Sequence, residues 1–539
     1  MKNKLTVAVF ISMFIISACN ANTLNEDVDT VAFEVTSGIE LSLETSTEAE
    51  TTIAETTHLE TSEAVSTTPE ETEPLETTRS LPENYLEQAK SMPDADTSTV
   101  IIQYANKKES IQKTNDRIAS IYNIPCINIT TQDAKTVNST EYYVPAVIDV
   151  FNCDEAYMLS AAGGVRLRGN STSNGWNEEK PYRIKFETKQ NMLGLHGGEK
   201  FKSWVLLMAQ WNVAMDYTGF NLAEVILDDY IYSSDCTYVM LYINGEYCGL
   251  HVLCEQNQAI EGRVEVLEED LNSLNPLKPD EMGYYLEIDN NADEEHPFFT
   301  LDYDEVTITD YSGTTRAMDH ENITIKSDIL TTDQYDFISS YTANIYRILY
   351  NACVNDTALM FDDDYNLVSA EGIYTPQEAV NAVIDVDSFV NMTLLYELIQ
   401  DYDIGAGSFY FAIDFSENST YPKFTCTSPW DFNWAYGENP DKNFYACTWQ
   451  KIQNDKWDRS NIWLITPMTA TWYQDMVAER WRILSESGVL EEVLDDITAT
   501  VIGLDKEYGD QPWKVDGALN VVQYVKDRIK FLDKQFLDS

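Results

Sequence analysis

The order of periodic patterns along the chain limits its fold more than any other feature. Residues 143–151 and 182–186 alternate apolar and polar side chains, as half-buried strands do. In residues 241–253, Asn244 and Gly245 separate two apolar runs and predict a β-hairpin. Helical periodicity marks residues 220–231, 333–353, 387–400, 472–486, 490–504 and 518–537. Strands thus dominate the front half and helices the back half, which predicts an α+β fold in two lobes.

The first residues have the pattern of an export signal. Lys2 and Lys4 precede an apolar run over residues 5–16, and small residues then precede Cys19. The run is too short for a permanent membrane-spanning helix, and its end is typical of a bacterial lipoprotein cleavage site. We therefore expect export, a lipoprotein signal segment over residues 1–19 that is cut just before Cys19, and a lipid anchor on that cysteine at the outer face of a bacterial membrane. An ordinary secretory signal with a chance cysteine is the alternative, and it predicts export as well.

Composition divides the remaining chain in two. Residues 20–81 are rich in Thr, Glu and Ser and cannot bury enough apolar surface to fold, which predicts a disordered spacer. Residues 82–539 are expected to form the folded domain. The whole chain has 35 Lys and Arg against 90 Asp and Glu, a net charge of -55, and this excess repels the phosphates of nucleic acids. We therefore expect no nucleic-acid partner.

The cysteines give no pairing. Of the 9 cysteines, all except Cys19 fall in the predicted folded domain, and their even number is compatible with disulfides in an exported protein. Buried thiols are equally compatible. Their spacing, in a chain with only 5 His, does not indicate a zinc site.

A glycine turn flanked by cations suggests a phosphate-binding loop. Arg168, Gly169 and Asn170 lie between two predicted strands, and Arg183 and Lys185 share one face of the second strand. Backbone N–H groups and cations around such a turn suit a polyphosphate, although the spacing is not that of a Walker loop. The alternative is a plain turn with solvated charges.

A second candidate is an acidic residue in an aromatic run. Asp431 lies between Trp430 and Phe432 in residues 429–437, and a carboxylate in so apolar a setting requires a cation or a metal. Asn433 follows two residues later. Because Mg²⁺ takes hard oxygen ligands, Asp431 and Asn433 form a candidate metal-ligand pair.

Three further acids complete the candidate site. Asp401 and Asp403 end a predicted helix before a glycine-containing loop, where a carboxylate can approach a substrate hydroxyl. Glu255 follows the second strand of the predicted hairpin, where it needs a cationic partner unless it lies on the surface. Solvated carboxylates are the alternative for all three in so acidic a chain.

Together, and in this order, the motifs resemble those of the CotH family of atypical, spore-coat-type protein kinases. The resemblance covers roughly residues 120–485 and depends on residues 165–172, 180–186, 193–195, 202–207, 241–247, 255–256, 283–287, 325–327, 396–398 and 429–437. It implies a kinase-like fold that uses ATP with Mg²⁺ or Mn²⁺ to phosphorylate Ser or Thr of a protein substrate at the cell surface.

The resemblance also implies roles for individual residues. It implies that Lys185, with Arg168 and Asn170, contacts nucleotide phosphates, and that Glu255 pairs with a cation. It further implies that Asp403 is the catalytic aspartate, which orients or deprotonates the acceptor hydroxyl, and that Asp431 binds the metal. Three positions depart from the family pattern: Asp401 replaces an Asn, Asn433 replaces an Asp, and Phe220 stands where an Arg is usual.

These departures keep other functions open. A surface protein that retained the fold but lost the chemistry, and that contacts cell-wall or polysaccharide material through its aromatic residues, is the main alternative. A glycoside hydrolase is a more distant one, because its two carboxylates must face each other at a set separation.

Overall fold

The computed structural model describes residues 94–169, 173, 178–209, 213–289, 292, 297–309, 315–401, 403–437, 461–504 and 512–537. These residues all belong to one compact unit, Thr72–Ser539. Cys19, the predicted spacer, Asn170 and Cys447 lie outside the described residues.

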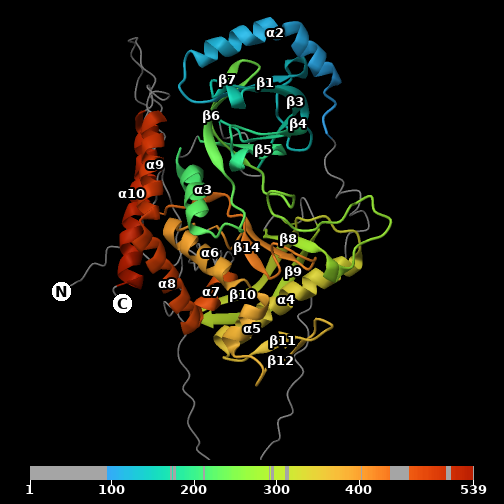
Figure 1. The fold of residues 1–539 in the computed structure, drawn as a ribbon, viewed down its shortest axis with the longest axis vertical. Helices are drawn as coiled ribbons and strands as arrows, with labels where there is room; N and C mark the ends of the chain where they lie inside the picture. Colours follow the sequence, from blue (N-terminus) through green and yellow to red (C-terminus); the bar gives the residue numbers. More distant parts are fainter. Residues whose placement is uncertain are drawn as a thin grey trace, which may run out of the picture. The chain divides into compact units, whose positions relative to one another are not determined.

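Seven strands form a closed barrel in the order β1-β2-β3-β4-β5-β7-β6 (Figure 1). Neighbouring strands are antiparallel except for β1 and β6, whose parallel pairing closes the barrel. The helix α2 (Ser98–Ala119) packs against β1 and β2. The strands are β1 (Cys126–Thr131), β2 (Val144–Phe151), β3 (Leu159–Leu167), β4 (Tyr182–Gln190), β5 (Phe201–Met208), β6 (Cys236–Ile243) and β7 (Glu246–Glu255).

The predicted hairpin is confirmed as β6 and β7. Asn244 and Gly245 both have positive φ, 54° and 78°, as the central residues of a type I′ turn require. The predicted alternation of β4 is also confirmed: Ile184 and Phe186 are buried in the core of the barrel, whereas Arg183 and Lys185 lie on its outer face and are only partly buried. The sequence pattern therefore placed both cations on one face.

A second, five-stranded sheet has the order β14-β13-β8-β10-β9. Its strands come from distant parts of the chain: β13 from the back half pairs with β8 from the middle on one side and with β14 on the other. The strands are β8 (Gly283–Ile288), β9 (Phe298–Thr309), β10 (Thr315–Ile325), β13 (Phe409–Asp414) and β14 (Thr425–Thr427), and a separate small hairpin is formed by β11 (Leu359–Phe361) and β12 (Leu367–Ser369).

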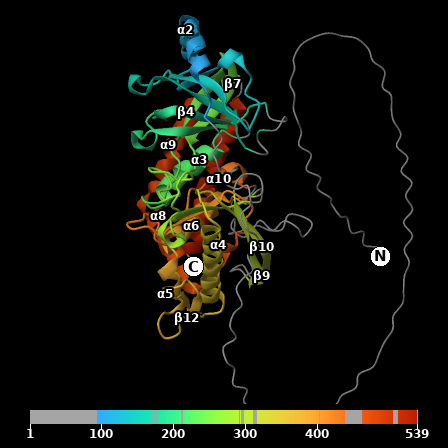
Figure 2. The same cartoon turned by 90° about the vertical axis from the view of Figure 1, so that its right-hand side faces the viewer.

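Helices make up most of the back half (Figures 1 and 2). They are α4 (Thr332–Val354), α5 (Pro376–Val383), α6 (Val386–Ile399), α7 (Ile462–Ile465), α8 (Thr471–Ser487), α9 (Val489–Gly503) and α10 (Pro512–Phe536), whereas α3 (Met215–Ile226) lies in the front half. All six predicted helices are present, and the fold is α+β with strands mostly in the front half and helices mostly in the back half. The cysteines among the described residues form no disulfide.

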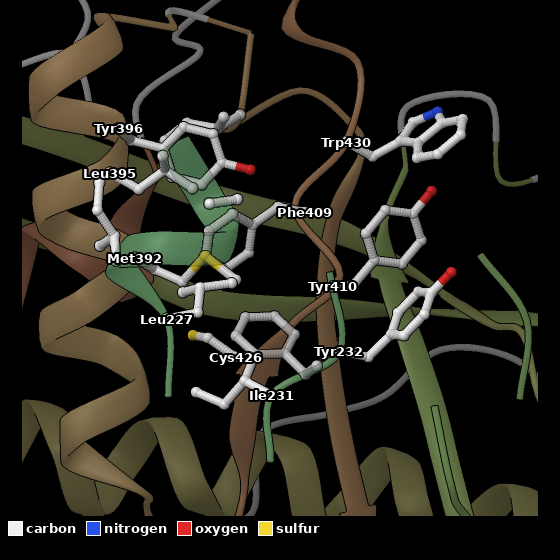
Figure 3. Close-up of a cluster of buried hydrophobic side chains, with 14 of the residues drawn as sticks. Leu227, Ile231, Tyr232, Met392, Leu395, Tyr396, Phe409, Tyr410, Cys426 and Trp430 are labelled. Carbon is white, nitrogen blue, oxygen red and sulfur yellow. The ribbon is translucent and has the colours of Figure 1, made fainter. Parts of the chain in front are cut away.

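The first predicted helix is shifted. It was expected over residues 220–231, but α3 ends at Ile226 and Leu227 is already extended. The reason is tertiary: Leu227 and Ile231 pack among Met392, Leu395 and Cys426 in the core cluster that Figure 3 shows. Apolar residues beyond the helix end therefore serve the core rather than the helical face.

Candidate active site

The predicted glycine loop and the predicted acidic segment meet through Arg168 and Trp430. Arg168 directly follows β3, and its backbone N–H donates to the Pro181 carbonyl at 3.2 Å, which holds the two ends of the loop together. Its guanidinium lies over the indole of Trp430, 5.1 Å from the ring centroid. Gly169 has φ 79°, a conformation that favours glycine. A cation of the barrel thus reaches the segment that carries Asp431.

Asp431 is held in a constrained position. It has left-handed backbone angles, φ 63° and ψ 55°, immediately before the short 3₁₀ helix η5 (Phe432–Trp434). The side-chain amide of Asn433 donates to Asp431 Oδ1. Burial raises the pKa of Asp431, while the nearby charge of Arg168 opposes this rise. Asp431 and Asn433, which the sequence predicts as candidate metal ligands, are therefore in direct contact, and Arg168 is the neighbouring cation.

A second carboxylate, Asp216, lies beside Asp431. It occupies the first turn of α3, and the backbone N–H of Phe432 donates to its carboxylate. Burial and the charge of Asp431 raise the pKa of Asp216 to about 7, against the opposing effect of Arg168. Its Oδ1 is buried without a hydrogen-bond partner among the described residues. The two carboxylates and the arginine therefore lie close together.

Asp401 and Asp403 enter from the end of α6. Asp401 is only 1% exposed, which excludes the alternative of a solvated helix end for this residue. Its Oδ1 accepts the backbone N–H of Asp403 at 3.0 Å. The charges of Asp401 and Asp216 both act on the partly buried Tyr436, whose hydroxyl donates to the Met215 carbonyl at 3.0 Å. Asp401 therefore belongs to the same acidic group as Asp216.

Phe220 explains one departure from the expected pattern. Its ring packs against Trp430 and Phe432, with centroid distances of 5.3 and 5.2 Å, and the side chain is 1% exposed. An aromatic contact thus fixes α3 to the segment of Asp431 at the position where an arginine was expected. Arg168 is consequently the cation that influences both Asp216 and Asp431.

Lys185 has a different ionic partner from the one that kinases use. Its Nζ lies 2.6 Å from Asp94 Oδ1, and Lys202 lies 3.7 Å from the other oxygen of the same carboxylate. These contacts lower the pKa of Asp94. Lys185 pairs with Gly164 and Ser203 across the sheet, and Arg183 lies two residues before it on the same outer face.

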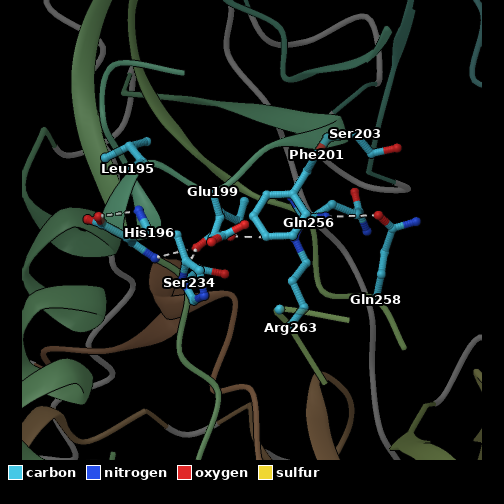
Figure 4. A network of polar contacts seen from close by, with 12 residues as sticks. Leu195, His196, Glu199, Phe201, Ser203, Ser234, Gln256, Gln258 and Arg263 are labelled. Carbon is cyan, nitrogen blue, oxygen red and sulfur yellow. Dashed lines mark hydrogen bonds and ion pairs between the residues drawn. The ribbon is translucent and has the colours of Figure 1, made fainter. Parts of the chain in front are cut away.

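Glu255 is buried rather than exposed beyond a strand. It is the last residue of β7, is 0% exposed, and contacts Arg263 Nε at 3.4 Å and His196 Nδ1 at 3.2 Å. The hydrogen bond to Glu255 raises the pKa of His196. Figure 4 shows His196 and Arg263 approaching this network from different segments. The cation-pairing expected of Glu255 is therefore present, with Arg263 and His196 as partners.

Arg263 links this network to the barrel. Its guanidinium lies 4.1 Å from the ring centroid of Phe201, and its Nη2 donates to the Ser203 carbonyl at 2.8 Å. Earlier in the same loop, the Asn257 amide donates to the Ser428 carbonyl at 3.1 Å, and Ser428 lies two residues before Trp430. The Glu255 network thus supports the segment that leads into the acidic group.

Comparison with known proteins identifies the family. The family model described as CotH kinase protein matches residues 165–534. This chain belongs to the CotH family. A search of curated proteins finds none that matches it.

Two sequence motifs of this CotH protein are explained by an ion pair outside the acidic group. Residues 283–287 lie on β8, residues 325–327 cover the end of the neighbouring strand β10 and the two residues after it, and Lys326 Nζ is 2.9 Å from Glu287 Oε2. The hydroxyl of Tyr410 donates to Glu287 Oε1 at 2.7 Å. These motifs hold together the second sheet.

Two neighbouring carboxylates of this CotH protein fit a divalent metal ion. No group of three or more His, Cys, Asp or Glu suited to a metal occurs in the described part of the chain. Asp431 and Asp216, however, are two neighbouring carboxylates, and one of them has an orphaned buried oxygen. Mg²⁺ commonly takes one or two carboxylates and completes its shell with water and substrate phosphates, so a larger protein cluster is not required.

Sequence reasoning missed Asp216, Asp94 and Arg263. Asp216 had a detectable signal, because it is an acid at a helix start only four residues before the unusual Phe220. Asp94 and Arg263 had none, since their roles depend on contacts between segments far apart in sequence. Within the described ranges, no helix is both long and apolar enough to span a membrane.

Proposed function

We propose that this CotH-family protein is a metal-dependent kinase that transfers the γ-phosphate of ATP to Ser or Thr of a protein at the cell surface. One observation carries the proposal: Arg168 lies beside two carboxylates, Asp431 and Asp216, that come from separate segments. Phosphoryl transfer requires cations on the phosphates and carboxylates on a metal, with little covalent chemistry by the protein.

The residues have distinct roles in this proposal. Arg168, with Asn170 and the barrel cations Arg183 and Lys185, binds phosphate oxygens. Because Lys185 pairs with Asp94, nucleotide must displace that carboxylate to reach the lysine. Phosphates are stronger and more highly charged acceptors than one half-exposed carboxylate, which favours the exchange.

Asp431 and Asn433 hold Mg²⁺ or Mn²⁺, and the metal supplies neutralisation of phosphate charge when bound. Asp403 accepts the proton of the acceptor hydroxyl or orients it, and Asp401 positions Asp403 through its hydrogen bond to the Asp403 backbone. Glu255 positions the adjoining loop through Arg263.

A phosphoryl-transfer assay tests this function. The full chain, purified in detergent, is incubated with γ-labelled ATP, Mg²⁺ or Mn²⁺ and an acceptor protein. We expect labelling that falls about a hundredfold or more in Asp431→Ala and Asp403→Ala, as for loss of a metal ligand or a general base. Asp363→Ala, an exposed acid in the turn between β11 and β12, is the matched control. Folded protein that labels nothing with either metal contradicts the proposal.

A surface-binding protein without catalysis is the second candidate. The Lys185–Asp94 ion pair and the aromatic packing of Phe220 favour it, because both replace contacts that nucleotide chemistry would use. Melting temperature separates the two candidates: a kinase is stabilised by ATP with metal, since a ligand that binds only the native state must stabilise it. Stabilisation by polysaccharide alone would support the second candidate.

The cellular localisation of the protein is also a proposal. We infer export and lipid anchoring at the outer face of a bacterial membrane from the sequence around Cys19. Growth with labelled palmitate should label the wild-type protein but not Cys19→Ala. An unlabelled wild-type protein would contradict anchoring and leave an ordinary secretory signal.

A further inference from the structure

We propose that Asp216 is the second metal-binding carboxylate of this protein. It takes the place of the Asp that the family pattern has where this chain has Asn433. This inference rests on the proposed function and assigns one of its residues. It starts from an oxygen that is difficult to explain otherwise: Asp216 Oδ1 is buried and has no hydrogen-bond partner in the described part of the chain. Leaving such an atom unpaired costs free energy, so a ligand that completes it is expected.

A structural role in α3 explains only part of this position. An acid in the first turn of a helix is favoured by the helix dipole, and Asp216 lies there. The helix cap, however, makes no side-chain hydrogen bond, and the Asp216 carboxylate instead accepts the backbone N–H of Phe432. The carboxylate is thus turned away from its own helix and towards the residue that follows Asp431.

The packing around Asp216 holds this orientation. Phe220, one turn further along α3, contacts both Trp430 and Phe432. Tyr436, beyond η5, donates its hydroxyl to the carbonyl of Met215, the neighbour of Asp216. Contacts on both sides therefore fix the start of α3 against the segment of Asp431.

The charges are also those of a cation site. Asp216 and Asp431 repel each other, and Arg168 is the cation that acts on both. One guanidinium cannot neutralise the charges of two partly buried carboxylates, whereas a divalent ion bound between them would. Asn433 supplies a neutral amide where the family pattern has a second Asp beside Asp431. Asp216 therefore restores a pair of acids at this site.

Manganese binding to the full chain tests the assignment. Electron paramagnetic resonance counts free Mn²⁺ in titrations of wild type, Asp216→Asn and the control Glu224→Gln, each with and without ATP. Glu224 lies on the same helix but is exposed. We expect Asp216→Asn to weaken Mn²⁺ binding about tenfold or more, as for loss of a charged ligand, and Glu224→Gln to bind like the wild type.

Two further readouts separate a metal ligand from a structural residue. Without metal, Asp216→Asn should melt at a higher temperature than the wild type, because the repulsion with Asp431 is removed. With Mn²⁺ it should gain less stability than the wild type. In the double variant Asp216→Asn, Asn433→Asp, the restored second carboxylate should recover most of the lost affinity.

The outcomes distinguish this inference from the proposed function. If the wild type binds Mn²⁺ with ATP and Asp216→Asn binds equally well, the inference is overturned and the kinase proposal stands. If the folded wild type binds no metal in the presence of ATP, both are overturned. Weakened binding in Asp216→Asn with rescue by Asn433→Asp supports the inference.

Discussion

Gly219 lies directly against the ring of Phe432. A Cβ at Gly219 would stand 2.3 Å from two ring atoms, closer than real side chains approach. Gly219 is in α3, and Phe432 follows Asp431, so the absent side chain permits the contact that brings Asp216 and Asp431 together.

Gly219→Ala should therefore disturb the acidic group as well as the stability. The ring of Phe432 must move, and overpacking of this kind costs about 1–3 kcal/mol. We expect a lower denaturation midpoint and weaker Mn²⁺ binding, measured by urea titration and by metal titration. Gly517→Ala in α10 is the control, because nothing lies near its Cβ position and alanine favours a helix. Equal effects of both substitutions would contradict the proposed contact.

Asp94→Asn should strengthen nucleotide binding. The substitution frees Lys185 from its ion pair, so ATP no longer competes with a carboxylate for this cation. Because Asp94 is 51% exposed, the pair itself should add less than about 1 kcal/mol to stability. We expect ATP to bind about twofold to tenfold more tightly by calorimetry, which corresponds to the same modest free energy. Asp96→Asn, a nearby acid that bonds only Ser98 in the described contacts, is the control. Unchanged affinity in Asp94→Asn would remove Lys185 from the nucleotide site.

The sequence predicted the elements of this fold better than its contacts. Alternation in residues 182–186 and the Asn244-Gly245 turn specify local geometry, and both appear as predicted. The five-stranded sheet was not predicted, because it pairs β8 with β13 across more than a hundred residues.

The same limit applies to the site. Arg168 and Asp431 were predicted from local chemistry, and the structure brings them to one place. Asp216 was missed because the sequence pattern began the helix at residue 220, so this acid lay outside the expected helix, whereas α3 begins at Met215. The partner of Glu255, Arg263, could not be assigned from sequence, since several cations satisfy the same requirement.

Stability should depend on pH through Glu321. Its carboxyl is fully buried and accepts hydrogen bonds from Tyr303 at 2.7 Å and Trp463 at 3.1 Å. Burial raises the pKa of Glu321 to about 7 from its ordinary value of 4.5. The folded state therefore holds a proton that the unfolded state releases, so this contribution is complete below about pH 4.5 and is lost as the pH rises to about 7.

Glu321→Gln should remove this part of the pH dependence, because the amide oxygen still accepts both hydrogen bonds. The wild type should lose on the order of 3 kcal/mol more than the variant between pH 4.5 and pH 7.5, measured by urea denaturation. The comparison with the variant is needed because burial also raises the pKa of Glu268, to about 8. Glu371→Gln, an exposed acid, should keep the wild-type profile. Parallel profiles for the wild type and Glu321→Gln would contradict the prediction.

Removing Arg528 should destabilise the protein through the charge that it leaves behind. Arg528 of α10 bonds Glu397 of α6 twice, from Nε to the carbonyl at 2.7 Å and from Nη2 to Oε2 at 3.0 Å, and both side chains are at most 1% exposed. Arg528→Met leaves the Glu397 carboxylate buried without this cation, which costs about 3–5 kcal/mol. Adding Glu397→Gln should recover a large part of the loss, since the uncompensated charge is then gone. Because α6 ends at Ile399, just before Asp401, Arg528→Met should also lower the rate of phosphoryl transfer as it lowers the stability. Urea denaturation of the two variants decides the matter: if the double variant is less stable than Arg528→Met, the buried charge is not the cause.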